Sequence, residues 1–195
     1  MMLTASAIRE EIEKGNIVIT PFNEEQLNPN SYNLKLADEL LIYDMHYAPM
    51  MITNFARMAV PAMYVPDHPI DMFNETPTRK ITIPKEGFTL YPGIVYLART
   101  VEFTETHNLI PCIDGRSSIG RLGINVHATA GFGDVGFKGT WTLEISVTQP
   151  VTIYPDIEIC QIYYQDIRGS VDREYNGKYQ DQVDATASRM YQEFA

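Results

Sequence analysis

The run Thr140-Trp141-Thr142-Leu143-Glu144-Ile145-Ser146-Val147 decides the fold class, because its side chains alternate in character. The odd-numbered residues are apolar and the even-numbered ones are polar, which is the period of two of a β-strand. One face therefore meets a core, and the other carries Thr142, Glu144 and Ser146. Such a face is typical of an antiparallel strand exposed to solvent, and it could equally present Glu144 to a ligand.

Comparable short runs occur on both sides of this strand, separated in places by turn sequences such as Pro92-Gly93 and Pro155-Asp156. Residues 6–14 have the spacing of a helix, with Ile8 and Ile12 on one face. Many short strands with almost no helix predict a mainly β fold of the sandwich, jelly-roll or barrel type. The predicted strands are residues 17–19, 32–36, 81–83, 88–90, 95–97, 140–147, 151–153 and 157–164.

Two segments depart from this pattern. The stretch from Ala48 to Thr78 is rich in proline and methionine, so we expect an irregular excursion that still packs against a core or another subunit. The polar residues 169–195 are expected to form an extended C-terminal arm. A length of 195 residues predicts a single domain, 1–195, that contains both segments.

The composition narrows the possible functions. Lysine and arginine number 15 against 25 aspartates and glutamates, which gives a formal net charge of −10. Such a chain is not expected to bind nucleic acid, although a local basic pocket for one nucleotide remains possible. Two cysteines, no apolar signal segment and no apolar run of membrane-spanning length predict a cytoplasmic protein without a membrane partner.

The densest polar cluster is the run from Asp114 to Gly123, with two arginines, two serines and three glycines. Donor side chains on a backbone that a ligand can approach closely indicate a bound phosphate. A turn followed by a helix capped by Ser117 or Ser118 explains the same residues equally well. Asp134 lies in a glycine-rich turn, and His127 is interpreted as a packed histidine rather than a catalytic one.

A zinc-dependent deaminase site is excluded by the motifs. Such sites use an H-x-E segment followed by P-C-x-x-C. Here Pro111-Cys112 is not followed by a second cysteine at that spacing, and none of the four histidines has glutamate two residues later. No zinc or other resident metal site is therefore predicted.

Taken together, these segments resemble the dCTP deaminases of the dUTPase-like superfamily. The match is carried by the order and spacing of the segments, and it covers most of the chain apart from Ala48 to Thr78. The matching segments are residues 21–22, 30–36, 115–123, 126–132, 134, 136–137, 142–144, 159–162 and 177–182.

The resemblance implies a distorted jelly roll of the β-clip type, assembled as a homotrimer with active sites between subunits. It implies hydrolytic deamination of dCTP to dUTP and ammonia without zinc, which supplies dUTP for dUMP and dTMP synthesis. Mg²⁺ is expected to accompany the triphosphate, bound mainly through phosphate oxygens and water. Feedback inhibition by dTTP is common in the family.

The resemblance also assigns residues. Glu144 would act as general base and then general acid on the water that attacks cytosine C4, with Arg121 keeping it ionised and Ser117 orienting the water. Arg116 and Lys178 would meet the phosphates. The full set of implied substrate contacts is Arg116, Ser117, Ser118, Ile119, Gly120, Arg121, Asp134, Thr142, Leu143, Glu144, Gln161, Tyr175, Lys178 and Gln182.

The chain departs from the family pattern at a few positions. Many members have aspartate and arginine where this chain has Asn33 and Lys35. The arm has Asp181 where glycine or asparagine is more familiar. None of these departures removes a catalytic group.

Three other functions remain as alternatives to deamination alone, which is our main prediction. The segment Thr129-Ala130-Gly131-Phe132 is similar to that of bifunctional members, which deaminate dCTP and also split the triphosphate to give dUMP and pyrophosphate. A pure dUTPase would need a glycine-rich arm, which this sequence lacks. A non-catalytic nucleotide-binding regulator would not need the carboxylate of Glu144.

Overall fold

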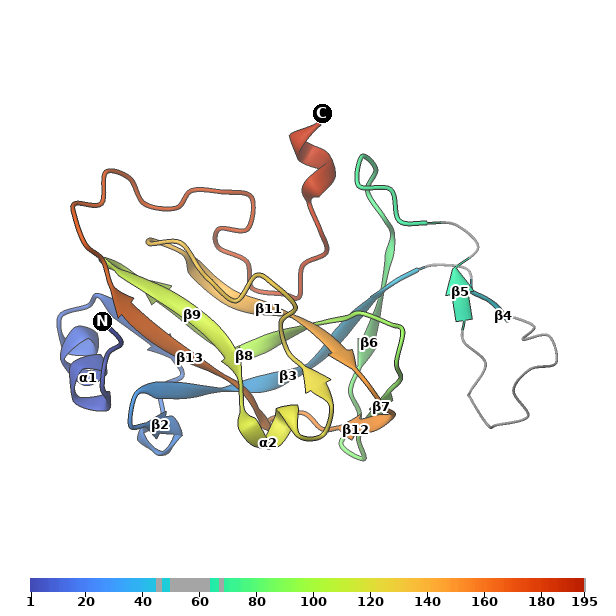
Figure 1. Cartoon of the computed structure of the whole chain (residues 1–195), viewed down its shortest axis with the longest axis horizontal. Helices are drawn as coiled ribbons and strands as arrows, with labels where there is room; N and C mark the ends of the chain where they lie inside the picture. The colour runs from blue at the N-terminus through green and yellow to red at the C-terminus, as the bar shows by residue number, and fades with distance from the viewer. Residues whose placement is uncertain (45–46, 50–63, 67–68, 195) are drawn as a thin grey trace.

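The N-terminal helix α1 (Ala5–Glu13) forms where the sequence predicts it (Figure 1). The Thr4 side chain caps its first turn by accepting from the Ala7 amide, and Ile8 is buried beneath it. The computed structural model describes residues 1–44, 47–49, 64–66 and 69–194. Within these residues, no helix is long and apolar enough to cross a membrane.

Nine of the described strands form one antiparallel sheet, in which β10, β11, β8, β3, β13 and β9 lie in that order. β1 also pairs with β8, and β2 and β6 pair with β3. The strands are β1 (Ile17–Thr20), β2 (Leu27–Asn28), β3 (Ser31–Tyr43), β6 (Thr78–Thr82), β8 (Tyr96–Thr106), β9 (Leu109–Gly115), β10 (Ile124–Asn125), β11 (Lys138–Val147) and β13 (Glu158–Asp166).

The remaining elements are short. β7 (Phe88–Leu90) pairs with β12 (Val151–Ile153), and β4 (Tyr47–Pro49) pairs with β5 (Tyr64–Pro66). One turn of helix, α2 (Ser117–Gly120), follows β9, and the 3₁₀ turns are η1 (Glu24–Gln26) and η2 (Met190–Glu193). The predicted mainly β, distorted jelly-roll fold with a short N-terminal helix is confirmed.

The alternation of apolar and polar side chains in residues 32–36 is typical of a half-buried strand, but the polar face of the central strand β3 is largely covered as well. Leu34 and Leu36 are fully buried, and Asn33, on the other face, is only 5% exposed. β3 pairs with β13 along its first half and with β6 and β8 along its second half, which places it in the middle of the sheet. The amide of Gln26 from η1 bonds the Asn33 carbonyl at 2.8 Å and helps to cover the polar face.

The C-terminal arm is extended, as predicted, and it crosses β11 (Figure 1). Gln182 forms an isolated parallel bridge with Gly139, and its carbonyl accepts from the Thr140 amide at 2.8 Å. A Cβ atom at position 139 would lie 2.7 Å from that carbonyl oxygen, and Gly139 has a φ of +148°. A glycine is therefore required where the arm touches the strand.

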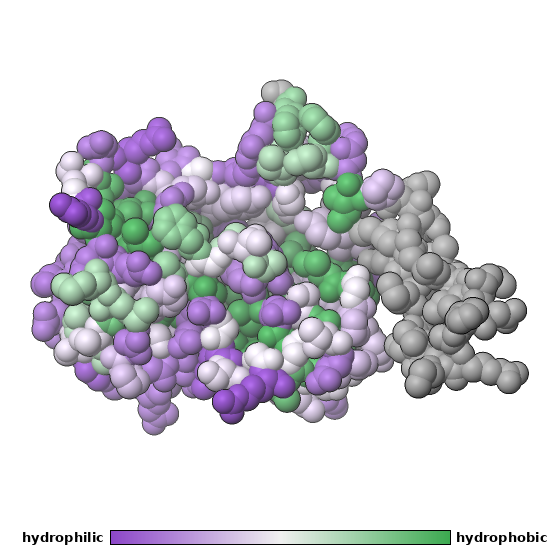
Figure 2. Space-filling model, viewed as in Figure 1, coloured by the Kyte–Doolittle hydropathy of each residue, from purple (hydrophilic) through white to green (hydrophobic). Residues whose placement is uncertain are grey.

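The expected excursion at residues 48–78 lies partly outside the described residues. Its described parts are the β4–β5 pair and an irregular segment that begins at residue 69. The ring of Phe73 in that segment lies 4.2 Å from the ring of Phe194, just after η2. Figure 2 shows apolar side chains gathered on this projecting C-terminal turn.

Candidate functional site

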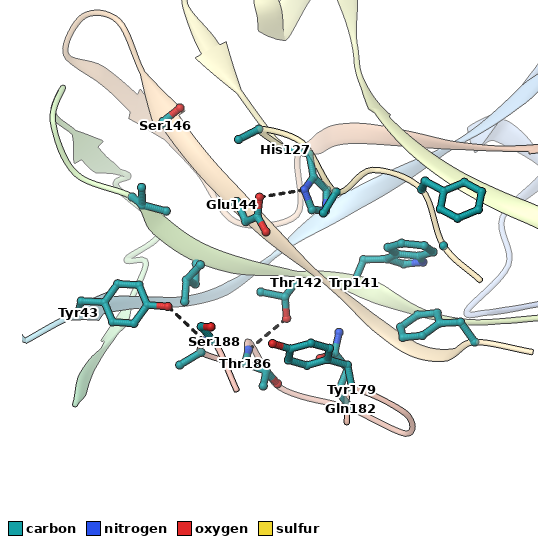
Figure 3. A pocket seen from close by; sticks show the side chains of 18 of the residues that line it. Tyr43, His127, Trp141, Thr142, Glu144, Ser146, Tyr179, Gln182, Thr186 and Ser188 are labelled. Atoms are coloured by element: carbon teal, nitrogen blue, oxygen red, sulfur yellow. Dashed lines mark hydrogen bonds and ion pairs between the residues drawn. The ribbon is translucent and has the colours of Figure 1, made fainter. Parts of the chain in front are cut away.

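The polar face of β11 lines a pocket of about 730 Å³ rather than open solvent. Thr142, Glu144 and Ser146 all contribute to its wall, and Trp141 lines it from the same strand (Figure 3). The face is covered because the arm and the loop around residues 127–134 fold over it. Of the two interpretations of this face, the structure favours the one that presents Glu144 to a pocket.

Glu144 is paired with His127 inside this pocket. Oε2 of Glu144 lies 3.3 Å from Nδ1 of His127, whose side chain is only 9% exposed. The hydrogen bond to His127 lowers the pKa of Glu144, although burial of the carboxyl acts in the opposite direction. Glu144 is therefore held ionised at neutral pH, as a general base requires.

The arm forms the opposite wall of the pocket. The Thr186 amide donates to Oγ1 of Thr142 at 3.1 Å, and the Ser188 amide donates to the hydroxyl of Tyr43 at 3.1 Å (Figure 3). The side-chain amide of Gln182 donates to the Thr140 carbonyl, while its Oε1 is buried without a hydrogen-bond partner in the described structure. Polar groups of the C-terminal arm thus form one wall of the pocket.

A second, more polar pocket of about 440 Å³ adjoins the first. It is formed by the end of β9, by α2 and by the loop after β10, and Arg116 and Ser117 line it. His127 and Ala128 line both pockets, so they form the wall between them. The N-cap residue of α2 is Arg116, without a side-chain capping bond, so neither serine has the capping role considered above.

The implied site residues are divided between these pockets. Asp134, Thr142, Glu144, Tyr175 and Gln182 line the larger pocket, and Arg116, Ser117 and Gly120 line the smaller one. The residues that line neither are Ser118, Ile119, Arg121, Leu143, Gln161 and Lys178.

Several of these outlying residues have other contacts. Leu143 is fully buried in the core, so its backbone alone is available to a ligand. Gln161 accepts from Ser31 and donates to the Gly115 carbonyl, and Lys178 is paired with Glu193. The alternation in residues 140–147 predicts the buried position of Leu143, whereas the sequence did not indicate the contacts of Gln161 and Lys178.

The expected catalytic trio does not assemble within one chain. Glu144 and Ser117 lie in different pockets, and the exposed Arg121 has no ion pair with Glu144 in the described part of the chain. His127, interpreted from sequence as a packed residue, is largely buried, and it also lowers the pKa of Glu144 through a hydrogen bond. Periodicity gave no signal for this pair, because the two residues are 17 positions apart on different elements.

Other reactive groups are not brought together in the described residues. No three histidine, cysteine, aspartate or glutamate side chains there are grouped to hold a metal ion. Cys112 and Cys160 are free and buried, and burial raises the pKa of the Cys160 thiol. Neither cysteine is activated as a nucleophile.

The fold and this site define a known class of protein. The chain matches the dCTP deaminase-like family over residues 2–167, and it belongs to that family. It is 46% identical over 194 residues to a "dCTP deaminase, dUMP-forming" from Clostridium acetobutylicum, with 100% of this chain and 99% of the relative covered. Proteins of the same description from Leptospira biflexa and Cytophaga hutchinsonii are 46% and 43% identical, with 100% of this chain and 98% and 99% of the relatives covered.

A solved structure shares the fold. The crystal structure of 2'-deoxycytidine 5'-triphosphate deaminase from Agrobacterium tumefaciens matches with a TM-score of 0.57 at 18% sequence identity. The match covers 84% of this chain and 47% of that chain, so this chain spans about half the length of the solved one.

Proposed function

We propose that this protein converts dCTP and two water molecules to dUMP, pyrophosphate and ammonia. The sequence analysis favoured deamination alone, with dUTP as product and the dUMP-forming reaction as an alternative. The relatives support the alternative, because those that cover the whole chain at 43–46% identity are described as dUMP-forming. The observation that carries the proposal is an ionised carboxylate, Glu144, within a pocket of nucleotide size.

Deamination follows from the position of Glu144. Its carboxylate takes a proton from the water that attacks C4 of cytosine and passes it to N3, and it then carries the second proton, from the new C4 hydroxyl, to N4 as the C4–N4 bond breaks and ammonia leaves. His127 holds the carboxylate ionised before attack. Trp141 and Phe137 line the same pocket and give it apolar surface for the substrate.

The triphosphate is assigned to the smaller pocket. Arg116 supplies guanidinium donors, and Ser117 adds a hydroxyl from the first turn of α2. Lys178 would exchange its ion pair with Glu193 for a phosphate oxygen. Mg²⁺ enters as part of the substrate, coordinated by phosphate oxygens and water.

We further propose a homotrimer in which a neighbouring chain brings Ser117 and Arg121 to Glu144, because one chain leaves them apart. Mixing inactive Glu144→Gln subunits with inactive Arg121→Ala subunits tests this. In a randomly assembled trimer of both variants, a site has an intact Glu144 in about half of the cases and an intact Arg121 from the neighbouring chain in about half. About a quarter of the sites then hold both residues, so activity should return to about a quarter of wild type. No recovery after exchange of subunits would contradict a shared site.

Product analysis tests the reaction itself. Incubation with dCTP and Mg²⁺ should release ammonia and pyrophosphate in equal amounts, with dUMP as the nucleotide product. Accumulation of dUTP would instead support deamination alone. Hydrolysis of dUTP without release of ammonia from dCTP would identify a dUTPase, and dCTP binding without turnover a regulator. We also expect dTTP to inhibit by competing with dCTP.

A further inference from the structure

Arg116 is held in the wall of the smaller pocket by a single residue, Glu158. Nη2 of Arg116 lies 3.0 Å from the Glu158 carboxylate oxygen Oε2, and Nη1 donates to the Glu158 backbone carbonyl at 2.6 Å. Figure 1 shows α2 beside the start of β13, where Glu158 lies. The two contacts fix the plane of the guanidinium, and its other N–H groups stay available to a ligand.

Asn33 fixes Glu158 from the other side. Its amide Nδ2 donates to the same oxygen, Oε2, at 2.8 Å, and its Oδ1 accepts from Nδ2 of Asn28 at 2.7 Å. Because Asn28 engages the oxygen end of the buried Asn33 amide, the nitrogen end is directed at Glu158. An aspartate at position 33 would place two carboxylates against each other.

The strand pairing supports a dedicated position for Glu158. Glu158 is opposite Lys35 and Cys160 is opposite Leu34, so β13 has one extra residue relative to β3 at this point. A bulge of this kind changes the direction of a side chain at the end of a ladder. Here the bulge begins at Glu158, the residue that contacts Arg116.

We propose that Glu158 is the positioning residue for Arg116, and that Asn33 must be an amide to hold it. This inference rests on the proposed function, since it assigns to Arg116 the binding of the dCTP phosphates. The contacts of Arg116 and Asn33 both end on Oε2 of Glu158, which is the geometry of a positioning role for this carboxylate.

The first experiment compares Glu158→Ala with Glu158→Gln in dCTP turnover. Loss of a charge-assisted bond to Arg116 should raise KM about tenfold in Glu158→Ala and leave kcat within about twofold. Glutamine still accepts from both partners, so its KM should stay within about threefold of wild type. Glu24→Ala is the matched control, since Glu24 also pairs with an arginine, Arg9, on an exposed surface.

The second experiment is a double-mutant cycle. Asn33→Asp should raise KM at least as much as Glu158→Ala, because it repels Glu158. The double variant N33D/E158A should then have the KM of Glu158→Ala, since no carboxylate remains to be repelled. Additive effects in the cycle would overturn the inference, and thermal unfolding midpoints show that each variant is folded. If Asn33→Asp does not fold, the comparison at position 158 decides alone.

The possible outcomes separate this inference from the proposed function. If wild-type protein turns over dCTP and Glu158→Ala keeps its KM, the inference fails and the function stands. An equal KM increase in Glu158→Ala and Glu158→Gln also overturns it, because the accepting oxygen would then be irrelevant. If wild-type protein releases no ammonia from dCTP, the proposed function fails and the inference fails with it.

Discussion

The two pockets that meet at His127 are built in opposite ways. The larger pocket has apolar side chains such as Leu97, Phe137 and Trp141 around the hydrogen-bonded pair of Glu144 and His127. The smaller pocket has a larger share of polar groups, among them Arg116, Ser117 and Asn125. The first environment offers a base, 36% exposed, that a bound substrate would cover, and the second favours binding of an anion.

The two pockets also differ in how they use the chain. The smaller pocket is made from a single stretch, residues 113–131. The larger pocket combines β8, β11 and an arm that begins more than 20 residues after β11. A local turn can therefore supply anion binding, whereas the reactive carboxylate depends on segments distant in sequence.

Glu144→Gln is the substitution expected to have the largest effect on activity, and it tests the role of the larger pocket. Loss of a general base typically reduces turnover by about 10²–10⁴-fold, while the neutral amide preserves the shape of the pocket. We expect kcat to fall by that amount and dCTP to raise the thermal unfolding midpoint as it does in wild type. Glu86→Gln on an exposed turn serves as control, and near-normal kcat in Glu144→Gln would refute the role of the carboxylate.

Arg116→Ala addresses the smaller pocket and should give the opposite kinetic pattern. Removing one partner of a charge-assisted contact costs about 2–5 kcal/mol, which corresponds to an increase in KM of about 30-fold or more. We expect kcat to change far less, because Arg116 lies outside the pocket of Glu144. A fall in kcat at unchanged KM would contradict the assignment of proton transfer to the larger pocket and of anion binding to the smaller one.

The sequence predicted the strand face that carries Glu144, because a period of two is a local property. It could not predict that this face is covered. The arm residues Gln182 and Thr186 reach β11 through backbone and side-chain hydrogen bonds about 40 positions apart in the chain. Such contacts leave no periodic signal.

The sequence did not predict most of β8, for a different reason. Buried polar side chains interrupt the alternation of β8: Thr104 accepts from the indole of Trp141, and Glu102 accepts from Gln26. Both residues are at most 1% exposed. A strand whose inward positions are polar resembles a loop in sequence, although Thr104 and Glu102 are hydrogen-bonded in the fold.

His127→Leu tests the wall shared by the two pockets. The hydrogen bond to His127 lowers the pKa of Glu144, so its removal should let burial raise that pKa. A carboxylate with a lowered pKa loses its ionised form only as pH falls through that value. We therefore expect the acid limb of the kcat profile to move to higher pH, with a larger loss at pH 5 than at pH 8. An unshifted limb would show that His127 does not set the ionisation.

The smallest effect is expected where the arm leaves the body, at His107. Its Nδ1 lies 2.9 Å from Glu174 on the arm and its Nε2 lies 2.7 Å from Glu105 on β8. The hydrogen bond to Glu174, followed by that to Glu105, raises the pKa of His107. A raised pKa means that the contact stabilises docking fully at low pH and is lost as pH rises through the folded-state value.

Trypsin cleavage at Arg173, next to Glu174, reports this docking. At low pH we expect trypsin to cleave wild-type protein more slowly than His107→Gln. As pH rises, the two rates should converge. Faster cleavage of wild type than of His107→Gln at low pH would contradict this prediction. Comparison with the variant at each pH removes the pH dependence of the protease itself. Because both side chains are partly exposed, KM for dCTP should change by less than about threefold. Loosening the arm would then affect the pocket of Glu144, which the arm covers, and leave the turn around Arg116 unchanged.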